Sequence, residues 1–270
     1  MEQEAVGKKG FWLSVTFRVF AVIFAASGLL MLQGLSEGLE PWVQGVMASS
    51  ALPDEIRFHA AVHGALIGLL FSGSLIAMLR NPLGKPLLLQ FYFVGHIIFL
   101  GTLLASDIQL AIQSFFVFIL FTVVLLILFG TYGKRKEIFR PTEPAAMNRY
   151  LLMMGGAALL GLLPFFINGL IGQVQDPVQQ FRWGEGAALS LVMVYGAYLA
   201  ATGRRGSRTL AVILSLTYVF LGAASITIPN HPGSWGTWGG AAAIVYAVLY
   251  AGIALRGKPS PAVSTAHNAS

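Results

Sequence analysis

The sequence predicts an all-α, polytopic membrane protein with eight transmembrane helices, arranged as two side-by-side four-helix bundles. The 270-residue chain is 56% hydrophobic and only 10% charged, with a mean hydropathy of +0.73, whereas soluble domains hold about 25% charged residues. Apolar segments of roughly 20 residues, the length that crosses the hydrocarbon core, recur along the whole chain. When they are taken as spans, all but two of the 17 lysines and arginines fall on one side.

The expected spans follow one another with short connections. They are 11–33, 57–79, 86–106, 108–130, 150–171, 184–202, 208–228 and 236–255. The first could pass for a signal peptide, but its apolar run reaches span length and Arg18 interrupts it, so we expect a retained helix. There is no cysteine, which excludes disulfides, thiolate metal sites and cysteine nucleophiles.

The charges also predict the orientation. The bases on the common side are Lys8, Lys9, Arg18, Arg80, Lys85, Lys134, Arg135, Lys136, Arg140, Arg149, Arg204, Arg205, Arg208, Arg256 and Lys258. Because cytoplasmic loops collect Lys and Arg, both termini are expected in the cytoplasm. This bias also accounts for the net charge of +6, so we expect no nucleic-acid partner. A bacterial inner (plasma) membrane is the expected location.

The two halves of the chain look alike, which predicts an internal repeat. Gln33-Gly34-Leu35 at the end of the first span matches Asn168-Gly169-Leu170 at the end of the fifth, and Phe99-Leu100-Gly101 matches Phe220-Leu221-Gly222. An even number of spans in each unit makes the two repeats parallel. We therefore expect bundles at 1–140 and 141–256, followed by a disordered tail at 257–270 that is rich in Pro, Ser and Ala.

The first half resembles the DoxX-like four-helix membrane modules. The residues that carry the resemblance are Arg18, Gly28, Gly34, Glu55, Arg57, Gly64 and Gly68. The resemblance covers 11–130, and a weaker resemblance covers 150–255. The resemblance implies a small bacterial inner-membrane protein, in a family of which some members are linked to quinone or sulfur redox chemistry. It carries no catalytic residues to this chain.

Three histidines within the spans are the main candidates for chemistry, because ionisable groups in a membrane are costly. His59 and His63 are four residues apart and share a helix face. His96 lies in the middle of the next span, and the short connection between these two spans makes them antiparallel neighbours. His63 and His96 can therefore come close if they face each other.

The histidines support several interpretations. Each can simply hydrogen-bond a neighbour, with His59 reaching water; they can serve a proton- or quinone-linked site; or His63 and His96 can bind heme b or a metal, since neutral imidazole is a ligand for iron, copper and zinc. Nearby glycines such as Gly64 and Gly68 could accommodate a flat ring or allow close helix packing. Gln109 and Gln113 could add hydrogen bonds to a bound ligand.

Charged residues gather at the outer mouths of the second and sixth spans. They are Asp54, Glu55, Arg57, Arg182 and Glu185. They could form a polar mouth for a ligand, pairing across the bundles, or they could be ordinary interfacial charges that cap helices. The loop around His231 could be a lid with His231 reaching inward, or a tight turn with two tryptophan anchors.

Three functions remain open at this level. The best interpretation is a redox-associated module that binds a lipophilic ligand such as a quinone. The alternatives are a b-type heme or metal protein using His63 and His96, and a small-solute transporter. Transport is less favoured because Pro164 is the only proline in the middle of a span and no charge lies clearly at the midplane. Whether the protein is an enzyme, and which proteins it contacts, stays open.

Overall fold

The computed structural model describes residues 2–43, 53–140, 146–176 and 181–256, and every regular element in these ranges is a helix. The first half contains α1 (Glu2–Ala26), η1 (Ser27–Met31), α2 (Gly34–Leu39), α3 (Asp54–His63), η2 (Gly64–Ser72), α4 (Gly73–Met78), η3 (Pro82–Gly84), α5 (Pro86–Ser106), α6 (Ile108–Gln113), α7 (Phe115–Thr131) and α8 (Arg135–Phe139). The second contains α9 (Arg149–Gln175), α10 (Arg182–Ala201), α11 (Ser207–Thr227) and α12 (Gly236–Arg256). The predicted tail at 257–270 lies outside these ranges. The predicted boundary between the two bundles, at 140 and 141, lies at the edge of the range that ends at 140.

Seven of the described helices are long and apolar enough to cross a membrane. They cover seven of the eight expected spans, and α3, η2 and α4 together form one of them, Asp54–Met78. The expected span 108–130 is instead divided at Ser114 into α6 and α7, with Asp107 Oδ1 accepting the backbone N–H of Leu110 at 2.9 Å to start α6. The apolar part that remains, α7, is shorter than the other seven, so the eighth crossing stays a prediction.

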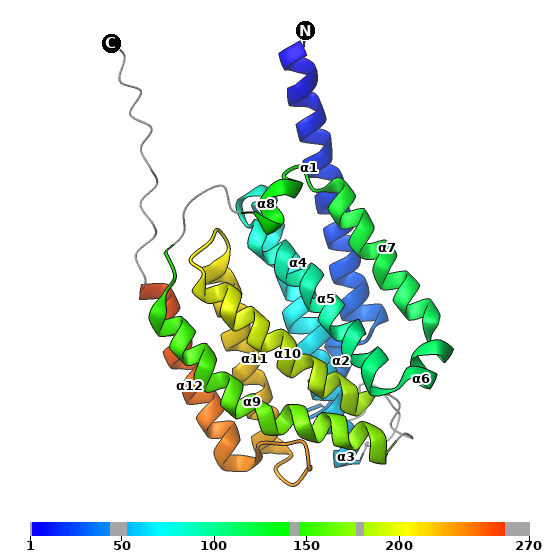
Figure 1. The fold of residues 1–270 in the computed structure, drawn as a ribbon, viewed down its shortest axis with the longest axis vertical. Coiled ribbons are helices and arrows are strands. Elements are labelled where there is room, and N and C mark those ends of the chain that lie inside the picture. Colours follow the sequence, from blue (N-terminus) through cyan, green and yellow to red (C-terminus); the bar gives the residue numbers. More distant parts are fainter. Residues whose placement is uncertain (1, 44–52, 141–145, 177–180, 257–270) are drawn as a thin grey trace.

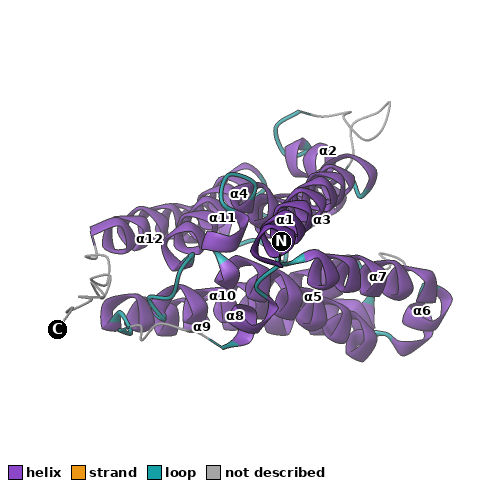
Figure 2. Cartoon of the chain, turned by 90° about the horizontal axis from the view of Figure 1, so that it is seen from above, coloured by secondary structure: helices purple, strands orange, loops and turns teal. Residues whose placement is uncertain are grey.

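The helices stand in two layers (Figure 2). One layer contains α1, the α3–α4 helix, α11 and α12, and the other contains α7, α5, α10 and α9. Both layers run from the first half of the chain to the second, so the two halves lie side by side (Figure 1). The internal repeat stays a prediction.

The four helices in the middle of the layers form the core. Their most apolar windows are 61–78% buried, whereas those of α1, α9 and α12 are 22% buried. The middle helices are the α3–α4 helix and α5 from the first half, and α10 and α11 from the second. One continuous apolar core therefore joins the two predicted bundles, and the outer helices leave apolar side chains for lipid.

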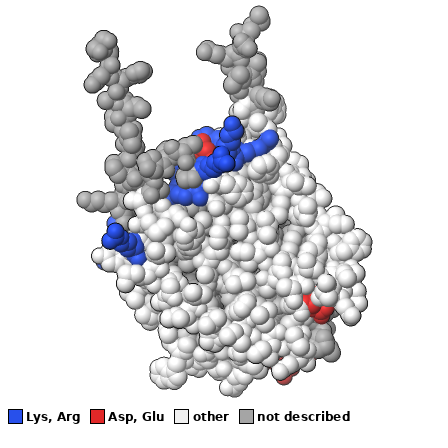
Figure 3. Space-filling view, in the orientation of Figure 1, with Lys and Arg blue, Asp and Glu red and all other residues white. Residues whose placement is uncertain are grey.

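The two ends of the molecule differ in charge (Figure 3). On the face shown, Lys and Arg side chains gather at the upper end, and the lower end shows only acidic ones. We call the upper end, which holds α8, the basic end. We call the lower end, which holds α2 and the start of α3, the acidic end (Figure 1).

At the acidic end the short helix α2 lies directly against η2, backbone to backbone. A Cβ placed on Gly68 would lie 2.9 Å from the carbonyl oxygen of Gly34, and one on Gly64 would collide with Gly38. Close packing is thus what Gly64 and Gly68 provide here. The contact holds α2, and with it Glu37, against the helix that carries His63.

Candidate functional site

A cavity at the acidic end is surrounded by ionisable groups from both halves of the chain. Its volume is about 260 Å³, and it is lined by Met31, Leu32, Gln33, Glu37, His63, Phe181, Arg182 and Glu185. Five of these are polar or charged, and three are apolar. Because such groups are costly within an apolar protein, their concentration at one point marks a candidate binding site.

The first ion pair at this cavity joins Arg182 of α10 to Glu37 of α2. Arg182 Nη1 donates to Glu37 Oε2, and Nη2 donates to Oε1 at 3.1 Å, which gives a two-pronged contact. The side chain of Glu37 is 4% exposed, so its charge depends on this arginine for compensation. The pair bridges the two halves of the chain, which are 145 residues apart at this point.

The second pair joins His63, the last residue of α3, to Glu185 of α10. His63 Nδ1 lies 2.9 Å from Glu185 Oε1, and His63 Nε2 lies 2.7 Å from the carbonyl oxygen of Leu32. Both ring nitrogens are therefore engaged, one by a carboxyl group and one by backbone. The second carboxylate oxygen, Glu185 Oε2, is buried and has no hydrogen-bond partner among the described residues.

Irregular helix geometry creates the acceptor for His63. The first span ends in the π-helical segment η1, after which Gln33 adopts a left-handed conformation with φ of 59°. The chain turns there into α2, and the carbonyl of Leu32 is left to accept from a side chain. A second π-helical segment, η2, begins directly after His63. Such segments are uncommon and are frequent at functional sites.

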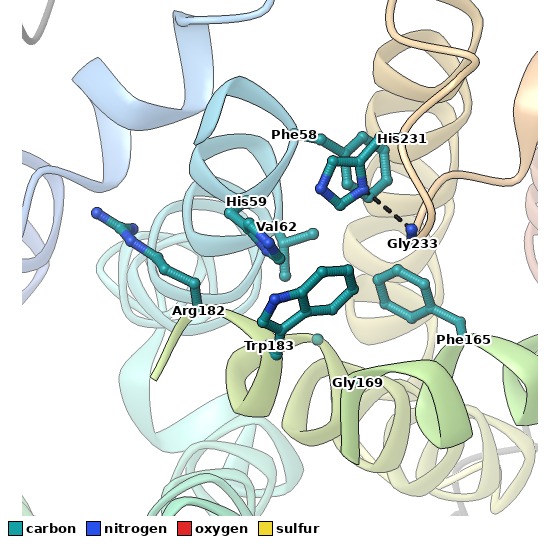
Figure 4. Close-up of a pocket in the computed structure, with 10 residues that line it drawn as sticks. Phe58, His59, Val62, Phe165, Gly169, Arg182, Trp183, His231 and Gly233 are labelled. Atoms are coloured by element: carbon teal, nitrogen blue, oxygen red, sulfur yellow. Dashed lines mark hydrogen bonds between the residues drawn. The ribbon is translucent and has the colours of Figure 1, made fainter. Parts of the chain in front are cut away.

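A second cluster, one helix turn closer to the start of α3, is aromatic (Figure 4). His59 packs edge-on against Trp183 and His231, with ring centroids 4.5 and 4.8 Å apart, and His231 stacks on Phe58 at 4.7 Å. The space between these rings is only about 10 Å³, enough for about one water molecule. This cluster is a packed aromatic wall.

His231 therefore reaches inward, as one of the two interpretations of its loop expected. It is 5% exposed, and its Nδ1 accepts the backbone N–H of Gly233 at 3.0 Å. Burial lowers the pKa of His231 to about 4, and the backbone of Glu55 and the nearby carboxylate of Asp54 offset this only in part. His231 is thus neutral near pH 7.

The structure separates the predicted histidines. His63 borders the larger cavity, while His59 belongs to the aromatic cluster, with Arg182 lining both. His96 is 1% exposed, donates from Nδ1 to the carbonyl of Tyr92 at 2.8 Å and stacks on Phe71 at 3.8 Å. Within the described residues no hydrogen bond or ring contact joins His63 to His96.

These positions bear on the heme and metal alternative. Iron or another metal on His63 would displace either Leu32 or Glu185 from its ring nitrogens. The described residues also contain no group of three or more His, Asp or Glu side chains suited to hold a metal ion. The use of His63 and His96 as heme ligands stays a prediction, and the geometry adds no support to it.

The other predicted site residues have varied positions. Gln109 and Gln113 are exposed on α6 and line neither cavity. Arg57 donates to Asp54 Oδ1 at 2.8 Å and to the carbonyl of Pro41, and Glu55 is exposed. Pairing across the halves does occur, but through Arg182 and Glu185, and their partners are Glu37 and His63.

Sequence reasoning missed several residues of the site. Glu37, Phe181 and the carbonyl of Leu32 were not selected, and Gln33 entered only as part of the predicted repeat. Hydropathy along the chain would not have revealed these residues, because they come together only in the folded protein. The close pair of glycines in α2, Gly34 and Gly38, was the one available sign that this segment packs tightly.

Comparison with protein-family models, with curated proteins and with solved structures found no match for this chain. Its helices are those of a multi-pass membrane protein by length and composition.

Proposed function

We propose that this protein is a multi-pass protein of the bacterial inner membrane that binds a lipophilic ligand such as a quinone in the cavity at its acidic end. The observation that supports the proposal most is the cavity itself, where polar groups from both halves surround a space of about 260 Å³ beside apolar side chains. Small-molecule sites combine these features, although most are larger, at about 300–1,000 Å³.

The orientation in the membrane belongs to the same proposal. The basic end faces the cytoplasm, α7 makes the eighth crossing, and both termini are cytoplasmic, in agreement with the bias of Lys and Arg. The cavity then opens near the outer surface. A redox-associated role, which the resemblance of the first half to DoxX-like modules implies, is part of the same proposal.

The apolar rim supports a ligand that arrives through the bilayer. Met31 is 79% exposed, and neighbouring Leu30 is 69% exposed. Both lie at the end of the first span, where a lipid-soluble molecule can approach the polar groups without passing through water. A hydrophilic solute would gain nothing from this rim.

Ligand binding can be measured on the purified protein in mild detergent. We expect a short-tailed ubiquinone to quench tryptophan fluorescence saturably. Phe181→Ala, which removes an apolar wall of the cavity, should weaken binding about tenfold, because burying an aromatic side chain against a ligand contributes about 1.5 kcal/mol. Phe139→Ala is the matched control, because Phe139 is an exposed aromatic residue at the basic end, away from the cavity. Absence of saturable binding, or equal loss in both variants, would refute the proposal.

Topology can be tested independently, because the chain contains no cysteine and any introduced one is unique. In intact cells a membrane-impermeant maleimide should label Gln109→Cys and Thr237→Cys but not Lys136→Cys; all three positions are exposed. Labelling of Gln109→Cys and Lys136→Cys from the same side would show that α7 does not cross.

A further inference from the structure

We propose that the cavity at the acidic end selects a ligand that donates a hydrogen bond, a neutral lipophilic molecule with a phenol-like hydroxyl group, and that Glu185 is the residue that accepts it. This inference rests on the proposed function and specifies the chemistry of the same site. It predicts preference for the hydroxyl-bearing form of a ring over the form without a hydroxyl.

The hydrogen atoms at His63 can be placed from its partners. The carbonyl of Leu32 can only accept, so His63 Nε2 carries a hydrogen. His63 Nδ1 and Glu185 Oε1 lie 2.9 Å apart, and two bare acceptors would repel at that distance. One proton therefore lies between Nδ1 and Oε1, whichever of the two atoms holds it.

This leaves one polar atom of the pair without a partner. Glu185 is 7% exposed, and its Oε2 has no hydrogen bond to any described residue. Because Oε1 faces the shared proton, Oε2 is an acceptor. A buried acceptor without a donor is destabilising, so a donor arriving there is favoured. Glu185 lines the cavity, and the broad terminal torsion of a glutamate lets the carboxylate turn toward a ligand.

The charges around the cavity favour a neutral donor over a cation. Glu37 and Arg182 cancel one another, and His63 and Glu185 with their shared proton are neutral together. An ammonium ion would add an uncompensated charge to a largely buried cluster, which is costly. A hydroxyl group supplies the hydrogen without that cost, and the apolar rim accepts the rest of the ring and its tail.

The test compares two probes that differ only in the donor: a 4-alkylphenol and its methyl ether, with the same alkyl chain. In detergent solution we expect the phenol to bind about tenfold tighter or more, because the ether leaves the buried acceptor without a hydrogen-bond donor. Glu185→Leu and the longer Glu185→Met, neither of which has an acceptor oxygen, should both remove this preference. Glu55→Gln, which changes an exposed acid at the same end, should keep it.

Each outcome bears on a distinct claim. Equal affinity for phenol and ether in the wild-type protein overturns the inference, while the proposed lipophilic site stands. Tighter binding of the matching alkylamine overturns the neutral-donor assignment. No binding of any probe refutes the proposed function and the inference together. If Glu185→Leu does not fold, Glu185→Met decides, because it also lacks the acceptor oxygens; an unchanged preference in it overturns the role of Glu185.

Discussion

The two ends of this protein use partly buried arginines in different ways. At the acidic end Arg182, whose side chain is 26% exposed, pairs with the buried carboxylate of Glu37. At the basic end Arg204 donates to Gln90 Oε1 at 2.5 Å and to the carbonyl of Ile138 at 2.9 Å, both neutral. Burial lowers the pKa of Arg204, as expected for a cation without a carboxylate partner in the described part of the chain.

The difference separates structure from function. Arg204 joins α8 to α5, and Gln90 in turn donates to Tyr195 of α10, so this network fastens the connection between the two halves. No cavity accompanies it among those described. The acidic end also fastens the halves together, yet it does so with costly charges around an open space. Charged groups gathered around a cavity indicate a binding site. Neutral acceptors around an arginine indicate a structural contact that holds helices together, and we call the contacts of Arg204 the clamp.

The largest effect is expected from Glu37→Ala. It leaves Arg182 without its carboxylate, which should lower the free energy of unfolding by about 3 kcal/mol. Replacing both partners with apolar residues, as in Glu37→Leu with Arg182→Met, should restore most of that loss while abolishing ligand binding. Denaturant titration in mixed micelles measures the free energy of unfolding, and quenching of tryptophan fluorescence measures ligand binding. A single variant as stable as wild type would show that the pair is not a coupled unit.

Gly64→Ala should have the next largest effect and lower the free energy of unfolding by about 2 kcal/mol. The new methyl group collides with the backbone of Gly38 and pushes α2 away from η2. Ligand affinity should fall with it, since α2 carries Glu37. Gly101→Ala is the matched control, because nothing lies within 4 Å of a Cβ placed there. Equal stability of the two variants would contradict the close packing at the acidic end.

Arg204→Ala tests the basic end and should cost about 1.5 kcal/mol, the typical worth of hydrogen bonds from a charged donor. Ligand affinity should be unchanged, since Arg204 lies at the opposite end from the cavity. Thermal unfolding and the fluorescence titration, run on the same sample, give both quantities. A loss of affinity without a loss of stability would erase the distinction between site and clamp.

The smallest effect is a pH dependence from His231. Its pKa is about 4 in the folded protein and about 6.5 when unfolded, so the unfolded chain takes up the proton first as the pH falls. This contribution to stability is therefore present above pH 6.5 and is lost toward pH 4, by about 1 kcal/mol between pH 7 and pH 5.5. His231→Gln should unfold with a shallower pH dependence over that interval. An identical slope would mean that His231 is protonated in the folded state.

The sequence was informative about the helices for a simple physical reason: a span must be long and apolar throughout, so its signal is local. Seven expected spans were found in this way. The break at Ser114 was missed because a single serine is inconspicuous in an apolar run, although its side chain can compete with helical hydrogen bonding.

The site was harder to predict because its contacts are not local. The sequence selected His63 as an ionisable group within a span and Arg182 and Glu185 as charges at the outer mouths of two spans, and all three border the cavity. It did not predict which residues form ion pairs, because the pairing of Arg182 with Glu37 depends on how α2 packs against η2. His96 was selected by the same rule and lies in an apolar, aromatic surrounding, where one backbone carbonyl satisfies it.

The ion pairs at the acidic end also constrain how the protein is made. Glu37 and His63 leave the ribosome before their partners, which follow 145 and 122 residues later. Until α10 is synthesised, Glu37 in α2 and His63 in α3 lack these partners from the second half of the chain. The two pairs can therefore form only after the sixth expected span has been made, so the acidic end of the protein is completed late in synthesis.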